Sequence, residues 1–371
     1  MRVTFIGSSV ASTRGGIETT IASLAAHLAV RHEVTLITGA GRRSDRPFKV
    51  AGVRVLQVPF VPRTSLASRA AFSTPQILSP YLIESLSTVI ASSLSKVARN
   101  ALAESDIIST HSKYDALFFS RIAATRGIPS VFHIQGSRFG ALFKALDRST
   151  VYIAISEWAK RDLTNRFGLS IRYVVSPGIP ERLLGLDRNE QEFVLFVARL
   201  QRSKGTLEAI RIFHEVSSLF PELRLVIIGD GPGRAEMERE AQHLSIRSKV
   251  EFLGAIPHED VLDYYAHAKL LLFPSKSEVY PLVPLEAMGA GCPVVASDVL
   301  NLTGGADGIP ILLPAARQEL WVTAVTRLLE KTEERVRVGN LGREWARTKT
   351  WTNASYEYER VLISTVQHYS A

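Results

Sequence analysis

The chain has 371 residues, of which 46% are hydrophobic and 22% are charged, a composition typical of globular proteins and not of disordered ones. This length exceeds what one hydrophobic core usually organises, so two domains are expected. No run of about 18 uncharged apolar residues occurs, which argues against a membrane-spanning helix. The one cysteine, Cys292, excludes an internal disulfide and a cysteine-rich metal site. We expect it to be a small buried apolar residue.

The net charge of +8 is unevenly distributed. Up to Gly185 the chain has 23 Lys and Arg against 11 Asp and Glu, whereas the remainder has 21 against 25. The basic first half suits an anionic surface such as membrane headgroups or a lipid-linked phosphate, although ordinary solvated charge explains it equally well. Nucleic acid is not expected as a partner, because no basic motif interleaved with aromatic residues accompanies the charge.

The first half alternates short apolar runs with segments of helical periodicity. MRVTFIG enters a strand pattern at once and shows no signal-peptide apolar region, so a cytoplasmic protein is the default expectation. The predicted strands are residues 3–6, 33–37, 53–58, 106–110, 129–134 and 149–155. Helices are predicted after Gly15, near 79–103 and near 114–126. This alternation predicts a parallel sheet with helices on both faces. The role of residues 60–100 stays open between a substrate site and packing.

The same pattern begins again in the second half. Its predicted strands are residues 192–198, 223–229, 249–254, 269–274 and 292–297. The Gly-, Pro- and charge-rich segment 176–191 is the predicted linker. We therefore expect an α/β protein with two Rossmann-like domains at 1–178 and 179–350. A helix at 351–371 is predicted to cross back and brace the first domain. Ligands of such sheets bind at the carboxyl ends of the strands, so a ligand in a cleft between the domains is expected.

Two places in the chain carry signals for phosphate binding. Gly15 and Gly16 stand at the start of the first predicted helix, where free N–H groups attract anions. The dinucleotide fingerprint G-x-G-x-x-G is absent there, which argues against a nicotinamide-dependent oxidoreductase. Arg199 and Lys204 follow the first strand of the second set, and two such donors suit a diphosphate. A structural turn and solvated loop cations are the alternatives.

The segment SEVYPLVPLEAMGAGCPVVAS holds two glutamates around a predicted helix start. Glu278 precedes the helix, and Glu286 lies about one turn inside it, with Pro281 and Pro284 at the entry. Carboxylates accept hydrogen bonds from sugar hydroxyls, and the free N–H groups between them suit a phosphate. A glycosidase needs two carboxyl groups flanking one bond. The two glutamates are not obviously placed in that way, so a hydrolase is disfavoured.

With these residues identified, the sequence resembles glycosyltransferase family 4 and its GT-B fold. EVYPLVPLEAMGAGCP resembles the family's E-x7-E pattern, which runs into E-A-M-x-x-G-x-P. VARLQRSKG resembles R-L-x-x-x-K-G, and GDGP, FLGAIPHEDV and the N-terminal GGIE also match. The likeness is strong over roughly 190–298. In the first half only GGIE, DIISTHS and VFHIQGS echo the family.

The resemblance implies a retaining transfer from a nucleotide-diphosphate sugar, UDP- or GDP-linked, with no essential metal and no other cofactor. The acceptor would be a glycan or a lipid-linked intermediate bound by the first domain, and the nucleotide sugar would be bound by the second. The basic first domain would allow a peripheral location on the inner face of a membrane. A catalytically silent nucleotide-binding scaffold of the same fold is the alternative, against which the intact charged residues speak.

Carried over position by position, the resemblance gives the second domain's residues their roles. Arg199 and Lys204 would bind the diphosphate and neutralise the leaving group. Glu286 would hold the ribose hydroxyls, and Glu278 would hold hydroxyls of the donor sugar.

Four more residues of the second domain are implied in donor binding. The backbone N–H groups of Leu282 and Val283 would touch the distal phosphate. Gly254 would lie beside the base. The family usually has a glycine directly after the first glutamate of the motif, but here that position is Val279, and Tyr280 follows it. This departure would tighten the sugar pocket.

In the first domain, Gly16, with Gly15 beside it, would approach the distal phosphate. His111 matches the family's histidine near the reacting carbon, although a lone histidine at a strand end is also an ordinary structural residue. The histidine of the family's V-H-G turn is replaced by Gln135 in HIQG, with His133 two residues earlier.

Overall fold

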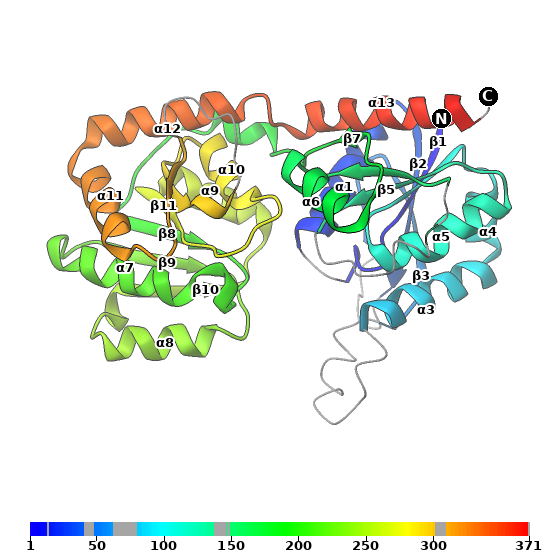
Figure 1. Cartoon of the computed structure of the whole chain (residues 1–371). Helices are drawn as coiled ribbons and strands as arrows, with labels where there is room; N and C mark the ends of the chain where they lie inside the picture. The colour runs from blue at the N-terminus through cyan, green and yellow to red at the C-terminus, as the bar shows by residue number, and fades with distance from the viewer. Residues whose placement is uncertain are drawn as a thin grey trace. The chain divides into compact units, whose positions relative to one another are not determined.

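The structure, a computed structural model, describes residues 1–12, 15–40, 48–61, 80–136, 146, 149–300 and 309–369. The chain forms two compact units (Figure 1). Unit 1 comprises Met1–Pro177 together with Trp351–Ala371, and unit 2 comprises Gly178–Thr350.

Unit 1 is built on a seven-stranded parallel sheet of order β3-β2-β1-β4-β5-β6-β7. The strands are β1 (Arg2–Ile6), β2 (Glu33–Ala40), β3 (Arg54–Pro59), β4 (Ile107–Thr110), β5 (Ser130–Ile134), β6 (Val151–Ala154) and β7 (Tyr173–Val174). Central strand β1 pairs with both β2 and β4, with Val3 opposite Val34 on one side and Ile107 on the other. The strand order reverses at β1, so the carboxyl ends of β1 and β4 frame the position where such sheets bind ligands.

The helices of unit 1 cover this sheet. They are α1 (Gly16–Leu28), α3 (Pro80–Leu94), α4 (Lys96–Ala103), α5 (Lys113–Thr125), α6 (Glu157–Phe167) and α13 (Trp351–Tyr369). The last helix, α13, packs on α1 and β5 (Figure 1). Its Trp351, Tyr358 and Leu362 join Val3 and Phe5 in one buried cluster. Helix α13 therefore completes the core that β1 begins.

Unit 2 has a six-stranded parallel sheet of order β10-β9-β8-β11-β12-β13. Its strands are β8 (Phe193–Val197), β9 (Arg224–Ile228), β10 (Val250–Gly254), β11 (Leu270–Phe273), β12 (Val294–Ser297) and β13 (Ile311–Leu313). Its helices are α7 (Thr206–Leu219), α8 (Arg234–His243), α9 (His258–His267), α10 (Leu282–Gly289), α11 (Gln318–Glu330) and α12 (Thr332–Ala346). Short 3-10 turns lie at Glu181–Gly185, Arg202–Lys204, Arg247–Lys249 and Asp298–Leu300. Trp321 and Tyr265 are the largest side chains that are fully buried in this unit.

The predicted alternation of strands and helices is confirmed, and two Rossmann-like parallel sheets are present. The sequence did not reveal β7 and β13, because two- and three-residue strands carry too little periodicity. The helix predicted near 79–103 is broken at Ser95, whose side chain accepts a hydrogen bond from the N–H of Ala98 and caps α4. Residues 62–79 of the unassigned region 60–100 lie outside the described residues.

None of the described helices is long and apolar enough to cross a membrane.

Gly205 fixes the turn between β8 and α7. Its φ of 72° lies in the left-handed region. A Cβ added there would lie 1.9 Å from the carbonyl oxygen of Pro274. The backbone of this turn therefore contacts the segment that follows β11 directly, and no side chain fits between them.

Gly205→Ala should destabilise unit 2 by more than about 2 kcal/mol, because it combines a left-handed conformation with a backbone collision. Thermal or urea unfolding measures the effect. Gly185→Ala is the matched control, since an added Cβ there has no heavy atom within 4 Å. Equal unfolding transitions for the two variants would contradict this account of the turn.

Candidate functional site

In unit 2 the predicted site residues gather at the carboxyl edge of the sheet. Arg199 and Lys204 follow β8, and Glu278 follows β11, the strand beside it. The two connections are joined by a hydrogen bond of 2.8 Å from the N–H of Lys276 to the carbonyl oxygen of Ser203. This contact holds side chains more than 70 residues apart in sequence against each other.

Lys204 and Glu278 form an ion pair. The Lys204 Nζ lies 2.6 Å from Glu278 Oε1, and the two side chains are only 22% and 9% exposed. The Ser275 hydroxyl donates a second hydrogen bond of 2.7 Å to the same oxygen. Within the described residues Glu278 Oε2 has no hydrogen bond, so one carboxylate oxygen is held in place and the other is available.

Helix α10 begins beside this pair with free donors. Within the described part of the chain, the N–H groups of Leu282 and Val283 have no acceptor, and Pro284 has no N–H. A helix amino terminus also carries a partial positive charge. The start of α10 therefore offers two N–H donors suited to an anion, as the two prolines predicted.

Glu286 lies one turn into α10 and is 4% exposed. Its Oε1 lies 2.7 Å from His258 Nε2, and its Oε2 accepts a hydrogen bond of 3.1 Å from the Tyr265 hydroxyl. The hydrogen bond to Glu286 is the main cause that raises the pKa of His258. Both oxygens are thus already engaged, and each keeps one further lone pair for a ligand hydroxyl.

The sequence did not identify His258 and Tyr265 as site residues. Both lie on α9, seven residues apart, and a separation of two helical turns puts them on one face. His258 stands within FLGAIPHEDV, a segment that was matched to the family without any role for its histidine.

Three other predicted residues end or follow strands of the same sheet. Arg199 is exposed and makes no hydrogen bond or ion pair with any described residue. Gly254 ends β10 with a φ of 73°, and its carbonyl oxygen accepts the N–H of Gly229 at 2.8 Å. Tyr280 is half-buried and packs on the hydrophobic core of unit 2.

In unit 1, Gly15 and Gly16 lie at the exposed amino terminus of α1. Gly15 has extended backbone with a φ of −174°, so its conformation does not require glycine. A Cβ at Gly15 would instead lie 2.8 Å from Glu18 Oε2. Glu18 is buried in the first turn and accepts a hydrogen bond from Ser9. The helix start is open, but it carries a carboxylate of its own.

His111, at the end of β4, is enclosed by aromatic rings and is 1% exposed. Its ring is stacked on Phe5 at 5.6 Å and meets the edge of His133 at 5.2 Å. Its Nε2 lies 3.1 Å from the Ser109 hydroxyl, and its Nδ1 lies 3.5 Å from Gln135 Nε2. Both ring nitrogens therefore have partners within the fold, and direct contact of His111 with a donor sugar stays a prediction.

The protonation of this group follows from its hydrogen bonds. His133 Nε2 lies 2.8 Å from the carbonyl oxygen of Val175, which only accepts, so that nitrogen carries the proton. His133 Nδ1 then accepts a hydrogen bond from Gln135 Nε2, which lies 3.2 Å away. The second N–H of the Gln135 amide points to His111 Nδ1, which makes His111 Nε2 a donor to Ser109. The two imidazoles are thus neutral and fix the orientation of the Gln135 amide.

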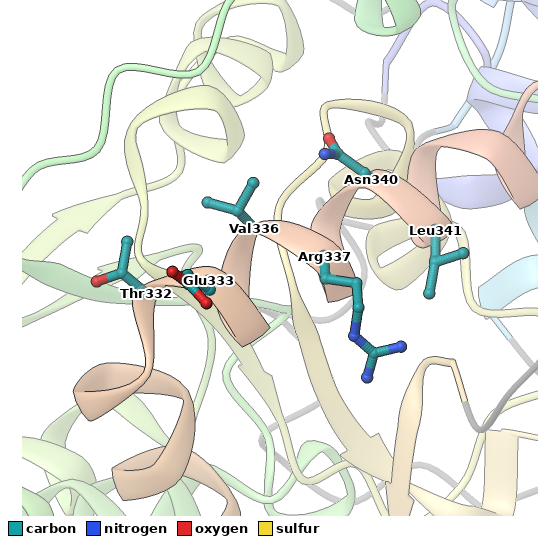
Figure 2. Close-up of a pocket in the computed structure, with 6 residues that line it drawn as sticks. All are labelled: Thr332, Glu333, Val336, Arg337, Asn340 and Leu341. Atoms are coloured by element: carbon teal, nitrogen blue, oxygen red, sulfur yellow. The ribbon is translucent and has the colours of Figure 1, made fainter.

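Outside the site, unit 2 has a shallow hollow of about 550 Å³ on the exposed side of α12 (Figure 2). All six lining residues belong to that helix: Thr332, Glu333, Val336, Arg337, Asn340 and Leu341. No predicted site residue lines it. It is the outer face of a helix whose other side packs on α10, and it offers no converging polar groups.

Comparison with known families decides what kind of protein carries this site. Residues 185–345 match the model for "Glycosyl transferases group 1", and residues 15–178 match the "Glycosyl transferase 4-like domain". The chain belongs to glycosyltransferase family 4. It therefore has the two-domain fold of that family, as the sequence motifs predicted.

Its curated relatives are distant. It is 28% identical over 240 residues to the D-inositol 3-phosphate glycosyltransferase of Corynebacterium aurimucosum. The aligned region covers 58% of this chain and 57% of that protein. It is 25% identical to the exopolysaccharide phosphotransferase SCO2592 of Streptomyces coelicolor, over 89% of this chain and 37% of that protein. The chain thus spans only about half, or less, of the length of these relatives.

Solved structures agree on the fold. Sucrose-phosphate synthase from Thermosynechococcus elongatus superposes with a TM-score of 0.79 over 99% of both chains, at 19% identity. Anabaena Alr3699/HepE, solved with UDP and glucose, superposes with a TM-score of 0.74 over 98% of this chain and 100% of that one, at 20% identity. Both likenesses show that the glycosyltransferase has the GT-B architecture.

The histidine pair should make the glycosyltransferase sensitive to acid. Burial lowers the pKa of His133 to about 4, and burial next to His133 lowers the pKa of His111 well below its usual value. Because unfolded histidine has a pKa near 6.5, the unfolded state binds more protons below that pH, and stability falls as the pH drops. His133 alone should account for about 3 kcal/mol between pH 6.5 and 4.

Urea unfolding at a series of pH values measures this slope. His133→Gln should flatten it, since glutamine does not titrate and still offers an N–H to Val175. The exposed His243 provides the control, because His243→Gln removes a histidine that lies outside the buried pair. A His133→Gln profile parallel to the wild-type profile would show that the acid sensitivity has another source.

Proposed function

We propose that this glycosyltransferase moves a hexosyl group from a UDP- or GDP-sugar to a glycan or lipid-linked acceptor. The proposed transfer retains the anomeric configuration and needs no metal. The observation that carries the proposal is the pairing of Lys204 with Glu278 beside the free N–H groups of α10. A cation, a carboxylate with one available oxygen and two backbone donors match the sugar and diphosphate parts of one ligand.

In this proposal the diphosphate lies between Arg199, Lys204 and the start of α10. Arg199 has no partner among the described residues, and one N–H of Lys204 is used by Glu278, which leaves two for phosphate oxygens. Fixed cations and helix N–H groups stabilise the charge that develops on the leaving phosphate. They would supply the role that a metal ion has in other transferases. In the described residues no group of three His, Cys, Asp or Glu is placed to hold a metal ion.

The hydroxyl groups of the donor would be shared between the two glutamates. Glu278 Oε2 would accept a hydroxyl of the sugar, while Lys204 and Ser275 hold Oε1 in place. Glu286 would accept the ribose hydroxyls with the lone pairs left by His258 and Tyr265. Gly254 would lie by the base, and Tyr280 would close the sugar pocket.

Unit 1 would contribute through Gly15, Gly16 and the histidine network. The exposed start of α1 would approach the distal phosphate. Because His111 is buried and Gln135 is half-buried, His111 would act as a positioning residue that orients the Gln135 amide. No dedicated base is assigned, since an oxygen of the leaving phosphate would take the acceptor's proton.

Calorimetric titration with UDP and with GDP, in the presence of EDTA, tests the donor site. We expect a dissociation constant on the order of micromolar for one of the nucleotides. Arg199→Ala should weaken it about 10- to 100-fold, because it removes charge-assisted hydrogen bonds to phosphate. Arg224→Ala is the matched control: Arg224 is also exposed, but it begins β9 at the opposite edge of the same sheet and pairs with Glu251.

If neither nucleotide binds, the diphosphate assignment fails and a catalytically silent protein of this fold is favoured. If both arginine variants weaken binding equally, the effect comes from net charge and not from a site at Arg199.

The stereochemistry and the metal requirement are tested on the transfer itself. With the nucleotide sugar that binds, proton NMR of the product should show the anomeric configuration of the donor, and EDTA should leave the rate unchanged. Glu278→Gln should lower kcat about 100-fold or more, since it removes the counter-charge of Lys204 and the acceptor for the sugar. The affinity for the nucleotide alone should change little. An inverted product would reject the retaining mechanism.

A further inference from the structure

Helix α3 of unit 1 has its polar and apolar faces reversed. A helix on the surface of a globular protein normally turns its apolar side to the core. Here the buried side is polar: Glu84, Ser85, Thr88 and Ser92 are each at most 3% exposed. The opposite side is apolar and exposed, with Leu86 at 41%, Ile90 at 52% and Leu94 at 76%.

Hydrogen bonds fix this orientation. Ser85 donates to Asp115, which is buried near the start of α5 and also accepts from the Ser8 hydroxyl at 2.5 Å. Ser8 follows β1 and Asp115 follows β4, so the polar side of α3 is attached to the carboxyl edge of the sheet. Rotating α3 to bury its leucines would leave these buried polar groups without partners.

The exposed apolar residues form one continuous stripe. Leu86, Ile90 and Leu94 are spaced four residues apart and therefore share one helix face. Val97, on α4, is 50% exposed, and Val61 is 40% exposed. The N–H of Val61 donates to the hydroxyl of Ser87 on α3 at 3.0 Å, which places Val61 beside the helix. We call these five residues the α3 stripe; α3 lies at the periphery of unit 1 (Figure 1).

The exposed charged residues of α3 and α4 are cations. The acidic residue of α3, Glu84, is buried, and Glu104 caps the far end of α4. Lys96 and Arg99 are exposed on α4. Arg99 Nη1 donates to the carbonyl oxygens of Ser93 and Leu94 at 2.8 and 3.1 Å, so a cation lies at the most exposed end of the stripe.

We propose that the α3 stripe docks this protein on an anionic lipid bilayer. Its apolar side chains would enter the boundary between headgroups and acyl chains, with Lys96 and Arg99 against the headgroups, and α3 would lie along the surface without spanning it. A second copy of the chain fits less well, because two stripes packed together would bring the cations Lys96 and Arg99 of both copies close to each other. This inference rests on the proposed function and makes it more specific. The acceptor would be lipid-linked and presented at the membrane.

Flotation of the full-length protein with vesicles tests the docking. Wild type should float with vesicles of phosphatidylcholine and phosphatidylglycerol at low salt, and markedly less with phosphatidylcholine alone. Ile90→Ser combined with Leu94→Ser should lower the partition about tenfold or more, because it removes two exposed apolar anchors. Lys96→Ala should lower it about fivefold, the effect of one surface cation near anionic lipid.

Val30→Ser is the matched control, because Val30 is 80% exposed in the same unit and lies outside the α3 stripe. It should float like wild type, and all variants should keep the wild-type melting temperature. Failure of the wild type to float with anionic vesicles would overturn the proposal, as would equal losses for Val30→Ser and the stripe variant.

Sedimentation velocity tests the alternative that a second copy of the chain covers the α3 stripe. If the wild type is a dimer, and Ile90→Ser with Leu94→Ser converts it to a monomer without changing flotation, the stripe is an interface between copies and lipid docking is rejected.

Nucleotide titration keeps this proposal distinct from the proposed function. The stripe variant should bind UDP or GDP like wild type, and a protein that floats but binds no nucleotide would reject the enzyme proposal while supporting the docking surface.

Discussion

The close approach of two backbone segments at the carboxyl edge of the second sheet is the constraint on which the candidate site depends. Gly205 leaves no room for a side chain above the carbonyl of Pro274, so the connection after β8 contacts the connection after β11. Lys204 and Glu278 each lie within a few residues of this contact, and their ion pair follows from it. The two residues of the K-G motif therefore act together. Gly205 permits the two backbone segments to come close, and this brings Lys204 within reach of Glu278.

The sequence predicted the elements of this edge well because the information is local, but it did not predict the ion pair. The strand, the short turn and the helix start each have their own residue pattern. Because the strands are parallel, their carboxyl ends lie at the same edge of the sheet. The partners of Glu286 were not predictable in the same way. His258 and Tyr265 reach that carboxylate only through the packing of α9 on α10, which no periodicity within either helix specifies.

In the first unit, distant parts of the chain decide the surroundings of the predicted residues. His111 was predicted as a site residue at a strand end, and the ring of Tyr358 of α13, almost 250 residues away, lies beside it and hydrogen-bonds Ser109 at 2.7 Å. Helix α3 was predicted as a helix, but its periodicity could not indicate which face is inward. Its inward face is held by Ser85, which hydrogen-bonds Asp115, the carboxylate that also accepts from Ser8. In both cases the deciding partner is distant in sequence and polar.

The position of α13 has a consequence for the order of events in synthesis. Trp351, Tyr358 and Leu362 belong to the core of the first unit, although the whole second unit separates them from its other members. As the chain leaves the ribosome, the second unit has all its own residues before the first receives its last helix. Until then the surface formed by Val3, Phe5 and Leu24 lacks its cover. The domain that is made first is the last to be completed, and in the interval its uncovered apolar surface is open to chaperones.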